Sequence, residues 1–172
     1  PADHRTGEMI RHADSVDTSG WIADLDIDLH VRAVIFISKP VMSPYLGHMR
    51  ITKFTGGLVQ TNGYLVETAE GNFLVDAPAG ITECVQAKGV RVDALYLTHQ
   101  HYDHVEDVAT LRAMGVKVFA WANYSKELTL EAFGSGWGLP AVVPYEVDEI
   151  IVEGERQMFG MKAKVSHVPG HS

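Results

Sequence analysis

Several features are scarce in this sequence of 172 residues, and each scarcity excludes a class of protein. The one cysteine, Cys84, cannot form an internal disulfide, which suits a reducing compartment, so we expect a cytoplasmic protein. The longest candidate for a membrane span, residues 31–38, is far too short to cross a bilayer. Basic side chains are also few. The 14 Lys and Arg residues stand against 22 Asp and Glu, and the formal net charge of −8 argues against nucleic acid as a partner.

Two regions of the chain differ in character. Residues 1–48 carry scattered charges and one stretch, residues 25–31, whose alternation of apolar and polar side chains predicts a half-buried strand. This region is either an N-terminal extension with an extra strand or, as we favour, sequence outside the natural core. Residues 49–172 are expected to form one domain, and we expect it to be truncated at its C-terminus.

Strand and helix patterns alternate from residue 51 onward and predict an α/β domain. Residues 58–68 and 73–76 are strand-like and flank a good turn sequence at residues 70–72, so a hairpin is expected. Apolar spacing and glycine stops predict helices over residues 81–88, 105–114 and 124–132. The remaining predicted strands cover residues 94–98, 116–120, 149–152, 156–159 and 162–167.

Four potential metal ligands fall within six residues: His99, His101, Asp103 and His104. His99 and His101 are two apart at the end of a predicted strand, so their side chains can point to the same side. Asp103 and His104 come where the chain should turn toward the next helix, and there adjacent side chains can diverge toward two ions. Imidazole and carboxylate ligands without thiolate suit Zn²⁺, with Mn²⁺ or iron as alternatives.

A fifth candidate, His171, follows a Pro-Gly turn near the end of the sequence. Together, His99, His101 and His171 make a three-histidine site with an open fourth position. A water bound at such a position has its pKa lowered to near 7, as catalysis by a metal hydroxide requires.

The run from Thr98 to His104 (THQHYDH), together with residues 169–172 (PGHS), resembles the metallo-β-lactamase superfamily and most closely its glyoxalase II-like hydrolases. Residues 61–66 (TNGYLV) and 73–78 (FLVDAP) look like the opening hairpin of that family and the aspartate-bearing strand end after it. The resemblance covers roughly residues 50–172. It implies an αβ/βα sandwich of two similar halves, of which this chain holds the first half plus the start of the second.

By position, the resemblance implies that His99, His101 and His171 hold the first metal and that Asp103 and His104 hold part of the second. The family completes the second site with an aspartate and a histidine later in the chain. A complete site would hold two zinc ions, with a hydroxide between them that attacks a carbonyl carbon. Asp103 would orient this hydroxide and is the predicted catalytic residue.

Two further residues are candidates for holding the ligand loops in place. Asp76 follows the strand of the predicted hairpin, and its alternative role is that of a simple turn-forming aspartate. His167 lies four residues before His171, and for it a packed or solvent-facing strand histidine is the favoured interpretation.

The leading functional hypothesis is a metal-dependent hydrolase acting on a small ester-like molecule: a thioester, a lactone or a β-lactam. Glutathione-specific relatives usually follow the motif with a pair of glycines, whereas this chain has Val105-Glu106-Asp107, which argues against glutathione thioesters. A nuclease would need a basic groove, and flavodiiron reductases usually have glutamate at the position of His101. The alternative is a mononuclear or inactive metal-binding relative. The sequence predicts no oligomeric state.

Overall fold

The computed structural model describes residues 33–37, 49–131, 136, 138 and 141–171. The strand expected at residues 25–31 lies outside the described residues. In chain order the elements are β1 (Ala33–Ile37), β2 (Arg50–Gly56), β3 (Thr61–Thr68), β4 (Gly71–Val75), α1 (Ile81–Ala87), β5 (Ala94–Tyr96), α2 (Tyr102–Val105), α3 (Val108–Ala113), β6 (Lys117–Ala120), α4 (Lys126–Thr129), β7 (Glu149–Ile150), β8 (Gly154–Met158) and β9 (Met161–His167).

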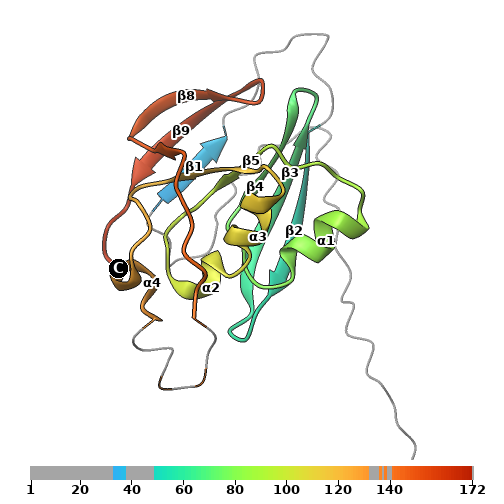
Figure 1. The fold of residues 1–172 in the computed structure, drawn as a ribbon. Helices are drawn as coiled ribbons and strands as arrows, with labels where there is room; N and C mark the ends of the chain where they lie inside the picture. Colours follow the sequence, from blue (N-terminus) through green and yellow to red (C-terminus); the bar gives the residue numbers. More distant parts are fainter. Residues whose placement is uncertain (1–32, 38–48, 132–135, 137, 139–140, 172) are drawn as a thin grey trace, which may run out of the picture.

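The strands form two sheets (Figure 1). The larger has the order β2-β3-β4-β5-β6-β7. Its first three strands are antiparallel neighbours, and β4, β5, β6 and β7 then run parallel, each pair joined by a crossover. The smaller sheet has the order β1-β9-β8 and is antiparallel. β1 belongs to residues 1–48, for which the sequence left two alternatives, an N-terminal extension or sequence outside the natural core. The predicted division near residue 48 stays a prediction.

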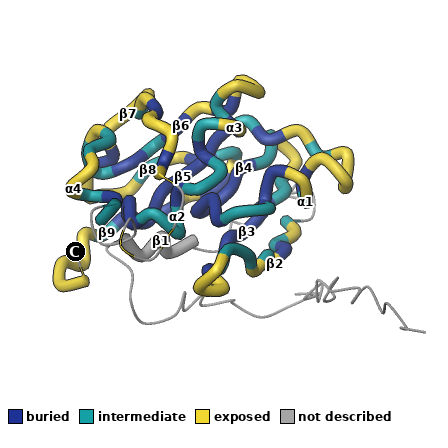
Figure 2. The backbone as a smooth tube through the Cα atoms, turned by 60° about the horizontal axis from the view of Figure 1, so that its bottom comes forward, coloured by how far each residue is buried: buried dark blue, intermediate teal, exposed yellow. Residues whose placement is uncertain are grey.

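The central strands β3, β4 and β5 of the larger sheet are largely buried, with apolar clusters on both faces, which explains their near-continuous apolar sequences (Figure 2). On one face, Leu74 and Leu95 pack with Val85 of α1 and Leu111 of α3. On the other face, side chains of β3, β4 and β5 pack against β8 and β9, where the buried residues are Met158, Met161, Ala163 and Val165. The layers are therefore helices, six-stranded sheet and three-stranded sheet, as an α/β sandwich requires.

The predicted hairpin is confirmed by β3 and β4, which pair from Tyr64 with Val75 to Thr68 with Gly71. The predicted helix at residues 81–88 is confirmed by α1, after which Gly89 adopts φ +64°. The strands β5, β6, β7, β8 and β9 start and end within a few residues of the predictions, β7 being the shortest at two residues. The sequence patterns predict no strand where β1 and β2 lie, so the first strand of each sheet order was missed. The helix predicted for residues 124–132 is shorter, because α4 covers only Lys126–Thr129 and residue 132 lies outside the described residues.

The single helix predicted for residues 105–114 is wrong, since this stretch contains the end of α2, a break at Glu106 and Asp107, and α3. The helix is interrupted because Ala77 takes the place of the helical hydrogen-bond partners of His104 and Asp107. The carbonyl of His104 accepts a hydrogen bond from Ala77 N–H (2.8 Å), and Asp107 N–H donates to the carbonyl of Ala77 (3.0 Å). These bonds dock the break onto the loop after β4 instead of continuing the helical ladder.

All helices of the described part are short. None of them combines the length and the apolar character needed to cross a bilayer.

Candidate metal centre

Three neighbouring strands of the larger sheet end at the same edge, because β4, β5 and β6 run parallel. β4 leads into Asp76, β5 leads through Leu97 into Thr98 and His99, and β6 leads into Trp121. Loops at the carboxyl edge of parallel strands are the usual place for a site in an α/β sheet. The topology therefore gathers the residues of the predicted motif and its neighbours at one edge.

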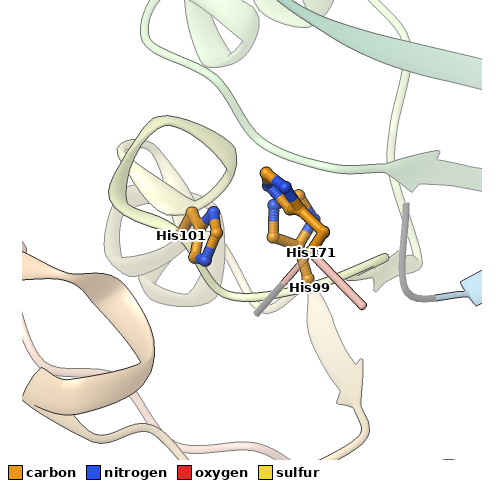
Figure 3. Close-up of side chains that lie close together, drawn as sticks. All are labelled: His99, His101 and His171. Atoms are coloured by element: carbon orange, nitrogen blue, oxygen red, sulfur yellow. The ribbon is translucent and has the colours of Figure 1, made fainter. Parts of the chain in front are cut away.

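His99, His101 and His171 lie together at this edge (Figure 3). One ring nitrogen of each lies within 4.8 Å of the other two. The ring centroids of His101 are 4.5 Å from those of both His99 and His171, and the His99–His171 separation is 4.9 Å. His99 and His101 are buried, whereas His171 arrives from the segment after β9 and is exposed. The structure thus brings together the three predicted nitrogen donors from two distant parts of the chain.

Asp103 and His104 lie beside this triad, on α2. His101 has an extended backbone (φ −61°, ψ 149°) and α2 begins at the next residue, so the chain turns between the two groups of predicted ligands. His104 Nε2 is 3.4 Å from Asp103 Oδ2, and the His104 ring centroid is 4.0 Å from that of His99. The Thr61 hydroxyl donates a hydrogen bond to Asp103 Oδ2. All five predicted ligands are therefore close neighbours.

Asp76 is buried and bonds to two residues of the metal motif, Thr98 and His104. Its carboxylate accepts hydrogen bonds from Thr98 N–H (2.8 Å) and from the Thr98 hydroxyl (2.6 Å), and it lies 2.8 Å from His104 Nδ1. A histidine that donates Nδ1–H to a carboxylate presents its Nε2 lone pair as a ligand. This geometry supports the loop-holding role predicted for Asp76.

The environment of His104 changes its affinity for a proton. Burial acts to lower the pKa of His104, but the charge of Asp76, the hydrogen bond to Asp76 and the charge of Asp103 together raise the pKa above its usual value. A cation bound at Nε2 would compete with this proton, so metal binding there should release it.

His167 is exposed at the end of β9. Its ring contacts that of Trp121 at a tilt of 36° with a centroid separation of 4.8 Å, and its backbone N–H donates to Glu153 (2.7 Å). These contacts favour the packed-histidine interpretation over a role in holding the ligand loops.

The structure adds supporting residues that the sequence did not identify as such. Thr61 contacts Asp103, and Gln100 is buried between His99 and His101. The Gln100 side chain bonds to Tyr145, which is 45 residues further along the chain. Thr61 belongs to a segment that the resemblance singles out, but no sequence pattern connects Tyr145 with the motif.

The donor set fits a catalytic transition metal. Three imidazole nitrogens leave a fourth position open, which is typical of catalytic zinc, and a neighbouring carboxylate and histidine suit a second ion. Iron and manganese accept the same donors. A cavity of about 760 Å³ lies elsewhere, at the amino ends of β5 and β6 beside Met114 and Phe159, so the donor geometry and not cavity size locates the site.

Comparisons with known proteins agree with this geometry. A family model described as the metallo-beta-lactamase superfamily matches residues 56–172. A search of curated proteins gives no match.

Two solved metallo-beta-lactamases share the fold. The B3 metallo-beta-lactamase BLEG-1 is 21% identical with a TM-score of 0.59, over 71% of this chain and 63% of that chain. The metallo-beta-lactamase GOB-18 from Elizabethkingia meningoseptica is 20% identical with a TM-score of 0.51, over 69% of this chain and 49% of that chain. TTHA1623, solved in a di-iron-bound form, is 34% identical with a TM-score of 0.49, over 62% of this chain and 56% of that chain.

The chain thus spans less than two thirds of the length of these relatives. The family model nevertheless covers well over half of the chain, including the whole motif and the Pro-Gly-His segment. With its α/β layers and its histidine cluster, the chain belongs to the metallo-β-lactamase superfamily.

Proposed function

We propose that this chain carries the metal centre of a hydrolase that uses zinc to cleave a small ester-like molecule. The observation that carries the proposal is the cluster of His99, His101 and His171, whose ligand nitrogens lie within 4.8 Å of one another. When bound there, zinc supplies Lewis acidity that brings the pKa of a coordinated water near 7 and polarises a carbonyl group.

The residues of the chain have separate roles in this proposal. His99, His101 and His171 hold the first ion, and Asp103 and His104 contribute to a second. The Thr61 hydroxyl fixes one oxygen of Asp103, which leaves the other oxygen to orient the attacking water. Asp76 fixes His104 through Nδ1 and so directs its Nε2 toward Asp103.

The proposed substrates are thioesters, lactones and β-lactams, with a glyoxalase II-like thioesterase as the working subtype. Glu106 and Asp107 stand where glutathione-specific relatives usually have glycines. Glu106 Oε2 accepts from Ala79 N–H (3.1 Å) and Asp107 Oδ2 from Thr82 N–H (2.9 Å). The charge of Glu106 is close enough to interact with that of Asp103, and this negative charge beside a predicted ligand disfavours a glutathione conjugate with its own carboxylates.

We also propose that the protein is cytoplasmic and that its partner is a small molecule. The single thiol of Cys84 suits a reducing cytoplasm. The acidic balance of the chain supports a small-molecule substrate and no nucleic acid.

The test is to remove metal from the 172-residue chain, reload it with zinc, iron or manganese, and measure metal content by elemental analysis. Hydrolysis is then assayed with a glutathione thioester, another thioester, a lactone and a chromogenic β-lactam. We expect tight zinc binding and zinc-dependent hydrolysis of one substrate class, both lost in His101→Ala. His167→Ala is the matched control and should retain both.

Failure to bind zinc would overturn the proposal. Tight zinc binding without hydrolysis of any of the four substrates would favour the alternative, a mononuclear or inactive metal-binding relative. The placed ligands leave that alternative open, since the described residues place three ligands at the first site and only two at the second.

A further inference from the structure

Gln100 lies between two predicted ligands but its side chain is bound away from them. It is 5% exposed. Its Nε2 donates to the backbone carbonyl of Ala122 (2.8 Å), two residues after β6, and its Oε1 accepts from the Tyr145 hydroxyl (2.7 Å). His99 and His101 meanwhile reach the metal cluster. The amide of Gln100 is therefore held at both ends, by Ala122 and by Tyr145, and this restrains the backbone that carries both histidines.

The Tyr145 hydroxyl, which donates to Gln100, belongs to a side chain that is held in place by burial and ring packing. This side chain is 7% exposed and its ring packs against Tyr124, with a centroid separation of 5.1 Å. Burial, followed by the charges of Tyr124 and Asp76, raises the pKa of the Tyr145 hydroxyl, so it keeps its proton and remains a donor to Gln100.

The segment that carries Tyr145, residues 141–148, has no regular secondary structure but is fixed directly after the tyrosine by polar contacts. Arg112 of α3 donates to Asp148 and to Glu146 (2.6 Å). Asp148 also pairs with Val118 of β6 through two bonds of 2.8 Å, one from its own N–H and one to its carboxylate. The position of the Tyr145 hydroxyl is therefore set by α3 and β6, not by its own loop.

We propose that Tyr145 and Gln100 are positioning residues of the metal centre, which fix the spacing of His99 and His101 by holding the residue between them. The inference rests on the proposed metal site and goes beyond it, because it assigns a role to the bonds of the Gln100 amide with Ala122 and Tyr145. A partner that orients ligands typically changes metal affinity by about 10- to 100-fold. Since Tyr145 acts through the backbone, the lower end of this range applies.

The test uses Tyr145→Phe, which removes only the hydroxyl, and Gln100→Met, which keeps the length of the side chain but removes both bonds. The zinc dissociation constant is measured by competition with a chromophoric chelator, and the Co²⁺-loaded chain gives the visible ligand-field spectrum of the site. Urea unfolding of the metal-free chain records the structural effect separately. We expect about tenfold weaker zinc binding and altered Co²⁺ bands for both variants. The double variant should bind no more weakly than Gln100→Met alone.

The matched control is Tyr124→Phe, which removes the hydroxyl of the neighbouring tyrosine that donates to Glu131 (2.8 Å). It should leave the zinc dissociation constant and the Co²⁺ spectrum unchanged. If Tyr145→Phe lowers the free energy of unfolding but changes neither metal readout, the pair is only structural and the inference fails. If the wild-type chain itself binds no zinc, the proposed function fails instead. Should Tyr145→Phe not fold, Gln100→Met tests the same link with Tyr145 intact.

Discussion

Asp76 combines an unusual backbone with three polar partners. Its φ of +59° is left-handed, a conformation that Asp and Asn tolerate better than other non-glycine residues. Its carboxylate is buried and serves Thr98 N–H, the Thr98 hydroxyl and His104. Both features follow from its place directly after β4, where the chain must turn beneath the motif.

Asp76→Asn should lower the free energy of unfolding by about 2–4 kcal/mol, because the amide replaces one acceptor oxygen by a donor among buried donors. Asn tolerates the left-handed backbone as Asp does, so the loss of stability in this variant comes from the changed side chain. Asp76→Ala should lose a further ~1 kcal/mol from the backbone. Urea unfolding of the metal-free chain measures both. Asp93→Asn is the control, as this half-buried carboxylate accepts from Asn72 N–H (3.1 Å) in a loop and should lose less.

His171 is an exposed ligand, so its contribution should depend on metal. His171→Ala is expected to leave the metal-free stability nearly unchanged, as is usual for exposed positions. Zinc at about a hundredfold excess over its dissociation constant should stabilise the wild type by about 2.7 kcal/mol and the variant far less. Thermal unfolding with and without zinc measures the difference. An equal zinc-induced shift of the unfolding temperature in both proteins would show that His171 is not a metal ligand.

At the scale of elements, α1 lacks a side-chain cap of its own. Its N-cap residue is Gly80, which has no side chain, and Asp107 from the break before α3 accepts the N–H of Thr82 instead. The α1 N-terminus is thus tied to the ligand-bearing segment.

Asp107→Ala should lower the free energy of unfolding by about 1–2 kcal/mol, as expected for loss of a helix cap. Chemical denaturation measures this. Ser125→Ala is the matched control, since Ser125 caps α4 locally through the N–H of Leu128 (3.3 Å). If Asp107→Ala costs no more than Ser125→Ala, the long-range cap contributes nothing beyond an ordinary one.

The Arg112–Asp148 contact predicts a pH dependence. The pKa of Asp148 lies below its ordinary value of 3.8, chiefly because the carboxylate accepts the N–H of Val118; burial opposes this and Arg112 adds to it. A lowered pKa in the folded state gives stability that is present above pH 3.8 and lost as the pH falls through the folded-state pKa. The metal-free wild type should therefore lose more stability below about pH 4 than Asp148→Asn. Parallel stability curves for the two proteins over this range would contradict the assignment.

At the scale of the whole molecule, two apolar clusters share one sheet. Leu95 faces the helices, and Met161 packs on the opposite face, where Phe73, Tyr96 and Phe119 form an aromatic ladder with ring separations of 5.5 and 4.6 Å. Since the same strands contribute to both clusters, we expect one cooperative unit.

Leu95→Ala and Met161→Ala should each lower the free energy of unfolding by about 2–5 kcal/mol and shift one common transition. Far-UV circular dichroism and tryptophan fluorescence follow the unfolding. Coincident curves for both variants would agree with one unit. A separate early transition in Met161→Ala would show that the β8–β9 layer unfolds independently.

The sequence determined those features that depend on spacing within one short segment. The hairpin of β3 and β4, the helix α1 and the metal motif from His99 to His104 are all visible as local patterns of apolar, turn and ligand residues. His171 was found because a Pro-Gly turn precedes it.

Only the tertiary structure decided which residues support the metal motif. It alone also decided where the helix predicted for residues 105–114 is interrupted. The partners of His104, Asp103 and Gln100 are Asp76, Thr61 and Tyr145, separated from them by 28, 42 and 45 residues. Helix and strand patterns carry no information over such separations, since these contacts form only when the fold brings strand ends and loops together at one edge of the sheet. For the same reason Ala77, a residue with no polar side chain, divides α2 from α3 through its backbone.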